Sequence, residues 1–318
     1  MADFWSAVLF AIEVTVPSVL LLFFGVLLRR SGQIGLDFCG QAARLVFNYG
    51  LPTLLFVNLV NSEIHYGEQI MLLSAGIVGT LVLFLGAELY AWRFVPALRD
   101  KGVFVQGVFR SNLGIMGLAF VQNAYGDSGL AAGAVYTGVI TILFNILAVI
   151  TLSRTGRGSW SEKLKTVTLK IATNPLIVAI VLALMLQALQ GHVPKPLLQT
   201  ARYVGNISLP LALVCAGATF DMKSILKKSD ISLQASIGRL VVAPLVAVSA
   251  GLAFGLSGVP MGVLYLMTAT PVAAASYVMA KSMGGNDVVA ANITGITTFG
   301  AVFSAAVGIV ALRSSGLM

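Results

Sequence analysis

Charged residues are scarce in this chain of 318 residues. Asp, Glu, Lys and Arg together make up 10% of the sequence, whereas a soluble domain carries about a quarter. Apolar residues make up 58%, and the mean hydropathy is +0.93. Because so few charged side chains cannot cover a water-facing surface, we expect the chain to lie in a lipid bilayer.

The sequence also lacks the motifs of common enzyme classes. Its two His and two Cys show no metal-ligand spacing, and it holds no phosphate-binding loop, no Asp-rich prenyl transferase motif and no Gly-x-Ser-x-Gly nucleophile elbow. We therefore expect neither an enzyme nor a bound metal or organic cofactor. Cys39 and Cys215 lie in apolar segments and are expected to be small buried side chains.

Long apolar runs, in contrast, are abundant. Each is close to the roughly 20 residues that a membrane-spanning helix needs. The ten segments are Phe4–Leu28, Phe38–Val60, Ile70–Ala91, Val103–Asn123, Gly129–Leu152, Leu164–Gln190, Leu197–Phe220, Ile231–Leu256, Met261–Met283 and Val288–Leu312. The sequence therefore predicts an all-α membrane protein with ten transmembrane helices.

Lys and Arg are distributed unevenly between the two sides of these segments. One side carries Arg29, Arg30, Arg44, Arg93, Arg99, Lys101, Arg154, Arg157, Lys163, Lys165, Lys170, Lys223, Lys227, Lys228 and Lys281. The other side carries Lys195, Arg202 and Arg313. The positive-inside rule places the richer side in the cytoplasm and both termini outside, as expected for a bacterial inner-membrane protein. The net charge of +8 then reflects topology and lipid contact and is not a footprint for nucleic acid.

The two halves of the chain resemble each other. The motif Asn48–Pro52 recurs 158 residues later as Asn206–Pro210, in corresponding apolar segments. The same offset relates Pro17 to Pro175 and Gly126 to Gly284. Because each copy has an odd number of spans, the second copy must enter the membrane from the opposite side. We predict two inverted five-helix repeats, residues 1–152 and 164–318, joined by a cytoplasmic linker at residues 153–163.

The fourth and ninth segments contain helix-breaking residues near mid-span. Gly114 and Gly117 weaken the fourth, and Pro271 interrupts the ninth. Such a break creates a helix N-terminus whose partial positive charge and free N–H groups suit an anion. No carboxylate lies in either break. We predict a substrate site at the crossover of helices 4 and 9, formed by Asn112, Gly114, Gly117, Thr270, Pro271 and Ser276. Packing by small residues is the alternative explanation of the breaks.

Other polar residues in the spans extend this prediction. Arg110 either adds a positive charge to the site or extends to the cytoplasmic interface. Asn48 and Asn206 either bind substrate or form hydrogen bonds between helices. Glu13 is a candidate for ion coupling if it lies within its span, and is interfacial if the span begins near it.

Two further residues bear on mechanism. Asn145 stands where a sodium/proton antiporter of similar architecture would need an aspartate, and an amide cannot carry a proton. Arg239 lies nearer the end of its span, where an ordinary interfacial position is expected.

The broken spans resemble the signatures of the auxin efflux carrier family. Ser111–Leu118 followed by Tyr125-Gly126 is similar to the family's Pro-Asn-Thr…Met-Gly-Ile-Pro…Tyr-Gly stretch, and Pro271–Lys281 is similar to its second signature. Ser111 departs from the pattern, since many members have a proline there. The resemblance implies that spans four and nine cross at the midplane. It also implies that spans one, two, six and seven form a scaffold and that the other spans form a moving unit.

The function expected from these features is secondary transport of a small organic anion by alternating access. The resemblance implies carboxylate substrates such as auxin in plants and dicarboxylates in some bacteria. The expected partners are this anion and membrane lipids, with a homodimer and coupling to H⁺ or Na⁺ left open. The alternatives are a sodium-coupled carrier of the bile-acid symporter type and a membrane sensor or channel without active transport.

Overall fold

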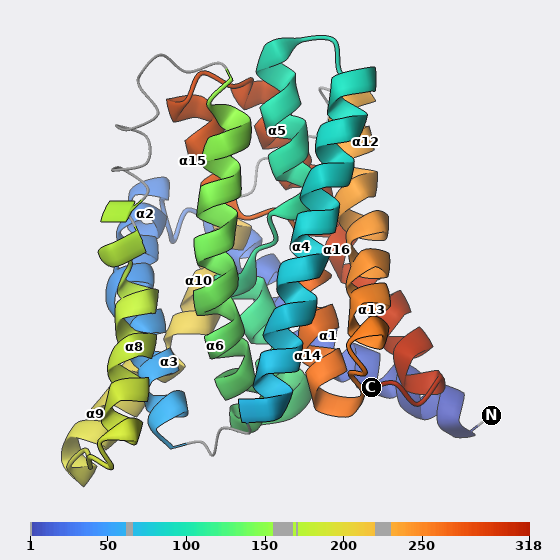
Figure 1. Cartoon of the computed structure of the whole chain (residues 1–318). Coiled ribbons are helices and arrows are strands. Elements are labelled where there is room, and N and C mark those ends of the chain that lie inside the picture. The colour runs from blue at the N-terminus through green and yellow to red at the C-terminus, as the bar shows by residue number, and fades with distance from the viewer. Residues whose placement is uncertain (1, 62–65, 155–167, 170, 220–229) are drawn as a thin grey trace.

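The structure is a computed structural model that describes residues 2–61, 66–154, 168–169, 171–219 and 230–318 (Figure 1). These ranges are helical apart from short connections. The helices are α1 Ala2–Arg30, α2 Leu36–Leu45, η1 Val46–Gly50, α3 Leu51–Val60, α4 Tyr66–Phe94, α5 Leu98–Phe109, η2 Leu113–Gly117, α6 Leu118–Leu152 and α8 Pro175–Ala188. They continue with α9 Lys195–Asn206, α10 Ser208–Ala218, α12 Asp230–Ile237, η3 Gly238–Val242, α13 Ala243–Ala253, α14 Gly258–Thr268, α15 Ala274–Ser282 and α16 Asp287–Ser314. The three η segments are single wide turns in which the helical hydrogen bonding is locally disturbed.

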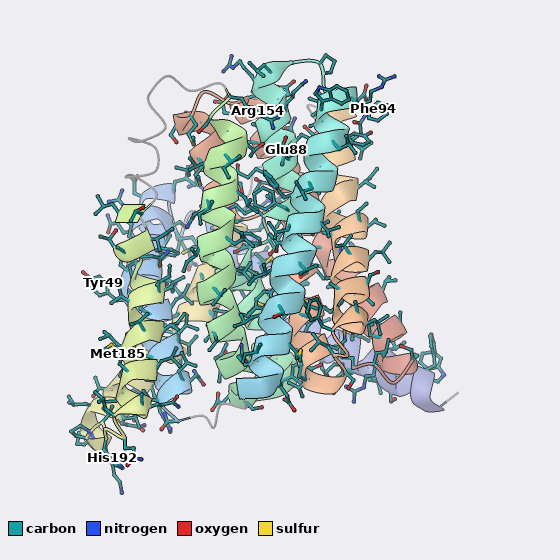
Figure 2. The ribbon with its side chains drawn as sticks, viewed as in Figure 1. Tyr49, Glu88, Phe94, Arg154, Met185 and His192 are labelled. Carbon is teal, nitrogen blue, oxygen red and sulfur yellow. The ribbon has the colours of Figure 1, made fainter. Side chains whose placement is uncertain are left out.

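The outer surface of this bundle is apolar. Within the described residues, six helical stretches are long and apolar enough to cross a membrane, and the helices Pro175–Ala188 and Gly258–Thr268 are shorter apolar ones. Large apolar side chains point away from the bundle, as Figure 2 shows for Tyr49 and Met185. An exterior of this kind suits hydrocarbon and not water. The predicted class of all-α integral membrane protein is therefore confirmed.

The boundary of one predicted segment differs in the structure. The sixth segment, predicted over Leu164–Gln190, appears as α8 from Pro175, where the Asn174 side chain accepts a hydrogen bond from Leu176 N at 2.9 Å. Asn174 therefore caps α8 and sets its start. Most of the predicted linker 153–163 lies outside the described residues, so the division into two repeats stays a prediction.

Glycine interrupts the chain after each of the two broken segments. Within α6, Gly126 has φ 60° and ψ −147°, so two helices meet there at a kink, between the predicted fourth and fifth segments. Gly284, its partner in the predicted repeat, has φ 80°. Both angles favour glycine, because a side chain is strained at positive φ.

Two groups of helices pack closely within themselves, and α1 joins the two groups through its contacts with α16 and α6. In the first, α3 packs against α8 and α9, and α1 and α2 pack against α10. In the second, α4 packs against α5 and α13, and α12 and α15 pack against α16. Cys39 and Cys215 are buried side by side in one small cluster between α2 and α10, which confirms their predicted burial. Both termini lie at the same end of the molecule, which is the lower end in Figure 1.

Glycine permits the closest contact within the first group. A Cβ on Gly217 of α10 would lie 1.9 Å from Leu22 O of α1, and a Cβ on Gly25 of α1 would lie 2.0 Å from Val214 O. The backbones of α1 and α10 therefore touch at two points, the kind of small-residue packing that is common between membrane helices.

Candidate functional site

Two interrupted helices cross near the middle of the molecule. The first leaves helical geometry after Phe109, and Arg110 has φ −88° and ψ 95°; the second leaves it after Thr268. The two extended segments pair antiparallel at Ser111 and Val272. Asn112 N donates to Pro271 O at 2.9 Å, and Ala273 N donates to Arg110 O at 3.1 Å. The crossing is thus held by backbone hydrogen bonds between residues far apart in sequence.

The two glycines of the first break have different roles from those predicted. The helix is interrupted before Gly114 and Gly117, which instead form part of the wide turn η2. A Cβ on Gly117 would lie 2.6 Å from Met267 Sδ, so this glycine lets η2 pack closely on α14. The nearest atom to a Cβ on Gly114 is Leu176 Cδ1 at 3.9 Å, so Gly114 leaves open space beside the crossing.

Arg239 binds the C-terminal ends of both half-helices. Its Nη1 donates to Val108 O at 3.0 Å, near the end of α5, and its Nη2 donates to Thr268 O, the last residue of α14. The side chain is 0% exposed. The expectation of an interfacial position for Arg239 is therefore wrong, because the side chain points from η3 into the crossing.

Arg110 is also buried at the crossing. Its Nη1 lies 2.9 Å from Met279 Sδ and its Nη2 donates to Asn145 Oδ1 at 2.9 Å. The Arg110 side chain does not extend to the interface. The amide oxygen of Asn145 instead accepts a hydrogen bond from its guanidinium. Within the described ranges, neither Arg110 nor Arg239 has a carboxylate within ion-pair distance. The crossing therefore carries two positive charges without a carboxylate partner.

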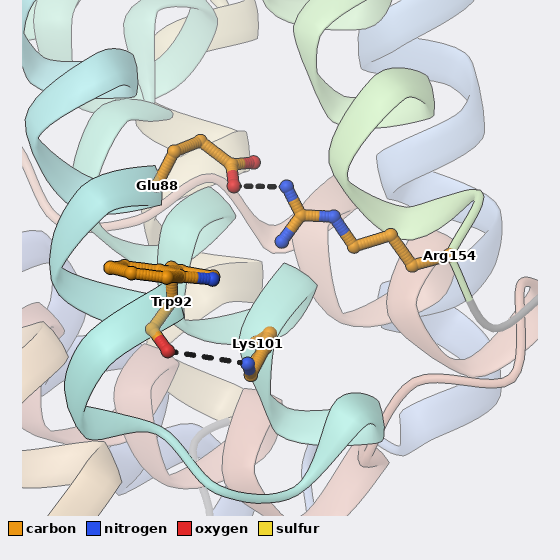
Figure 3. Close-up of polar contacts among 4 residues, drawn as sticks. All are labelled: Glu88, Trp92, Lys101 and Arg154. Carbon is orange, nitrogen blue, oxygen red and sulfur yellow. Dashed lines mark hydrogen bonds and ion pairs between the residues drawn. The ribbon is translucent and has the colours of Figure 1, made fainter.

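The ion pair found among the described residues lies away from this site. Glu88 of α4 pairs with Arg154, just beyond the end of α6, at the rim of the bundle (Figure 3). Lys101 Nζ donates nearby to Trp92 O at 3.5 Å. These contacts tie the ends of α4, α5 and α6 together and leave the crossing arginines unpaired.

One cavity opens onto the crossing, and we call it the crossing cavity. Its volume is about 760 Å³, and it brings together Asn48, Asn112 and Pro271 of the predicted site. Further polar residues in its wall are Arg44, Thr219, Thr294 and Thr298. Asn112 and Ala274, at the start of η2 and α15, line it too, so two helix N-termini face this space.

The crossing cavity, at 760 Å³, is the smaller of two large cavities, and the larger one has a volume of 1070 Å³. We call the larger one the amide cavity because its wall is rich in amide side chains. These are Asn58, Asn61, Gln69, Gln122, Asn123 and Asn206. It lies toward the end of the molecule that carries both termini, since the end of α3 and the starts of α4 and α14 line it (Figure 1).

The amide cavity also contains charged residues that the sequence did not single out. Glu68, Asp127 and Arg202 line it. Asp127 directly follows Tyr125-Gly126 of the family-like motif, and that position is the one local signal that points to it. Nothing local in the sequence marks Glu68 or Arg202, because both lie near segment ends where charges are common.

Besides Arg110, Gly114 and Gly117, three more residues of the predicted site line neither of the two cavities. Thr270 is fully buried and its Oγ1 donates to Met267 O at 3.2 Å. Ser276 is buried in α15, and its Oγ has no hydrogen-bond partner among the described residues. Glu13, the candidate for ion coupling, is exposed on α1. Asn48 and Asn206, which are paired by the predicted repeat, line different cavities.

Comparison with known proteins relates nearly the whole chain to transporters. A family model described as membrane transport protein matches residues 10–309. An uncharacterized transporter of Methanothermobacter thermautotrophicus is 25% identical over 275 residues, which cover 84% of this chain and 87% of that relative. The uncharacterized transporter YfdV of Escherichia coli K12 is 23% identical over 277 residues, which cover 83% of this chain and 86% of the relative. The matched region includes both crossing segments.

Proposed function

Because this chain belongs to the membrane transport protein family, the auxin efflux carrier family, we propose that it moves a small organic anion across the membrane by alternating access. The chain is a membrane transporter and not an enzyme. The proposed substrate is a carboxylate, and its proposed site is the crossing cavity, where Asn48 and Asn112 supply amide hydrogen bonds from two sides.

The arrangement of charge at the crossing carries this proposal. Two helix N-termini, at Asn112 and Ala274, face the crossing cavity, and the first N–H groups of a helix have no partner within it. Each such end carries a partial positive charge. Arg110 adds a full charge at the crossing without a carboxylate partner in the described residues. An anion is therefore attracted to this place and a cation is repelled.

The two cavities support the proposed alternating access. They involve opposite ends of the bundle, and both are bounded by helices of both packing groups. We propose that α4–α6 and α12–α16 move as one unit against α1–α3 and α8–α10. In this proposal the chain has ten spans in two inverted repeats, which accounts for the placement of Asn48 and Asn206 in different cavities.

Topology and coupling complete the proposal. The positive-inside rule places both termini outside, and the structure has them at one end of the bundle (Figure 1). Glu13 keeps its proposed role in ion coupling only if it reaches the substrate path in another conformation, since it is exposed on α1 in this one.

The proposal is tested by uptake into liposomes that contain the purified protein. A panel of mono- and dicarboxylates is compared with organic cations of similar size. We expect saturable uptake of at least one carboxylate that follows its gradient, with a strongly reduced apparent affinity in Asn112→Leu. Gln33→Leu, in the exposed loop after α1, is the control and should behave as the native protein.

Other outcomes of this assay identify the alternatives. An absolute requirement for Na⁺ indicates a sodium-coupled carrier of the bile-acid symporter type. Flux that does not saturate indicates a channel, and binding without flux indicates a sensor. Saturable uptake of organic cations with no uptake of any carboxylate refutes the proposal.

A further inference from the structure

The position of Arg239 is unusual for a charged side chain in a membrane protein. Its guanidinium bridges Val108 O and Thr268 O, which lie at the C-terminal ends of α5 and α14. The last carbonyl groups of a helix lack partners within the helix and carry partial negative charge. In cation-coupled transporters with broken helices, carbonyl groups of this kind hold the coupling cation.

The positive charge of the Arg239 guanidinium is close in magnitude to the combined negative charge of the two helix ends. A helix C-terminus corresponds to about −0.5 elementary charge, so two of them together offset about one positive charge. The Arg239 side chain is fully buried, and its Nε has no hydrogen-bond partner among the described residues. A lone charge at this depth is costly unless it is compensated. The two helix ends supply that compensation in place of a carboxylate.

The guanidinium is also separated from the substrate side of the crossing. Arg239 lines neither the crossing cavity nor the amide cavity. The cavity side carries the helix N-termini at Asn112 and Ala274, and Arg239 binds the opposite, C-terminal ends. Its effect on substrate must therefore pass through the placement of the two broken helices.

We propose that Arg239 is a positioning residue that serves as a built-in cation. Its guanidinium permanently fills the place between the ends of α5 and α14 where a free cation would otherwise bind. Substrate binding on the other face of the crossing then requires no Na⁺ at this place. The transport part of this inference rests on the proposed function, whereas its effect on stability does not.

The first test removes the side chain and supplies a free cation. In Arg239→Ala, the carbonyl groups of Val108 and Thr268 lose their donor and a space opens between them. We expect the Tm of the purified protein to fall by roughly 5 °C. Guanidinium or Na⁺ at millimolar concentration should restore much of this loss in a saturable way, whereas choline at equal ionic strength should not. The native protein should show no such response.

Three variants separate charge from packing. Arg239→Met fills the space without charge, so its Tm should be low and insensitive to both cations. Arg239→Lys keeps the charge, so it should be closer to the native protein than Arg239→Met. Arg110→Ala removes a buried arginine that binds Met279 and Asn145 instead of helix-ending carbonyls, so Na⁺ should not restore it. If Arg239→Ala does not fold, the comparison of the Lys and Met variants decides.

The inference is overturned by any of three results. The first is an Arg239→Met variant that matches the native protein in Tm and transport. The second is an Arg239→Ala variant whose Tm does not respond to Na⁺ or guanidinium. The third is a native protein that itself needs Na⁺ for stability or uptake. The Tm measurements contain no substrate. Failure to find any transported anion would therefore refute the proposed function while the cation response still supports the built-in cation.

Discussion

Replacing Asn112 by Asp places a negative charge at the proposed anion site with little change in shape. Asn112 N donates to Pro271 O at 2.9 Å, and Asn112 O accepts from Gly117 N at 3.0 Å. Both bonds belong to the backbone, so Asn112→Asp should leave the crossing intact. The side chain lines the crossing cavity, so the new carboxylate would face the bound substrate.

The expected loss of affinity follows from the repulsion of two like charges. At a separation of about 4 Å and an effective dielectric constant of about 20, the repulsion is about 4 kcal/mol. Since 1.4 kcal/mol corresponds to a factor of ten, this is roughly a thousandfold. Water in the cavity screens part of it, so we expect apparent affinity to fall by at least about 100-fold. Asn112→Leu, which only removes hydrogen bonds, should cost about 1–3 kcal/mol.

The assay is binding of a transported carboxylate by the purified variant as a function of pH. The loss of affinity should reach its full size at high pH and should become smaller as pH falls, because a protonated Asp carries no charge. Asn174→Asp is the control, since Asn174 caps α8 and lines neither cavity, and Asp caps equally well. Native-like affinity of Asn112→Asp at high pH would refute an anion site at this cavity.

Three further predictions concern packing, motion and topology. Gly217→Ala should force α1 and α10 apart by about 1 Å and lower stability by about 1–3 kcal/mol in thermal unfolding, whereas Gly86→Ala, with no atom within 4 Å of its Cβ, should not. Pro52→Ala and Pro210→Ala should slow uptake without changing apparent affinity, because each proline frees a carbonyl in a helix beside the moving unit; normal rates in both would count against this. Cysteines next to either terminus should react with an impermeant thiol reagent in intact cells, and one at Gln33 should not; the reverse pattern would invert the topology.

The sequence predicts the second break better than the first. Proline lacks a backbone donor, so Pro271 marks its break locally. The first break has no proline, and the chain leaves the helix at Arg110, before the glycines that were expected to cause the interruption. The cause is tertiary, because Arg110 and Asn112 form backbone bonds with Ala273 and Pro271. No local signal in the first segment reveals such a partner.

The functional residues likewise differ in how well the sequence predicts their positions. Asn112, beside the first break, and Asn48, four residues before Pro52, line one cavity, as the sequence predicts. The sequence predicts Arg239 near a span end, although it follows the start of the helical stretch at Asp230 by more than two turns. Its depth could be estimated from that distance, but its contacts with Val108 and Thr268 depend on how three helices meet. Hydrophobic patterns locate spans and say little about which polar groups face one another across them.

The long-range bonds at the crossing have a consequence for how the protein is made. Val108 O, near the end of α5, accepts a hydrogen bond from Arg239, and Asn112 N donates one to Pro271 O. Both partners, Arg239 and Pro271, are synthesised long after the first segments enter the membrane. Until then, these carbonyl and amide groups must be satisfied by water or by the insertion machinery. The amino-terminal half should therefore remain immature, and exposed to quality-control proteases, until the carboxy-terminal half has been inserted beside it.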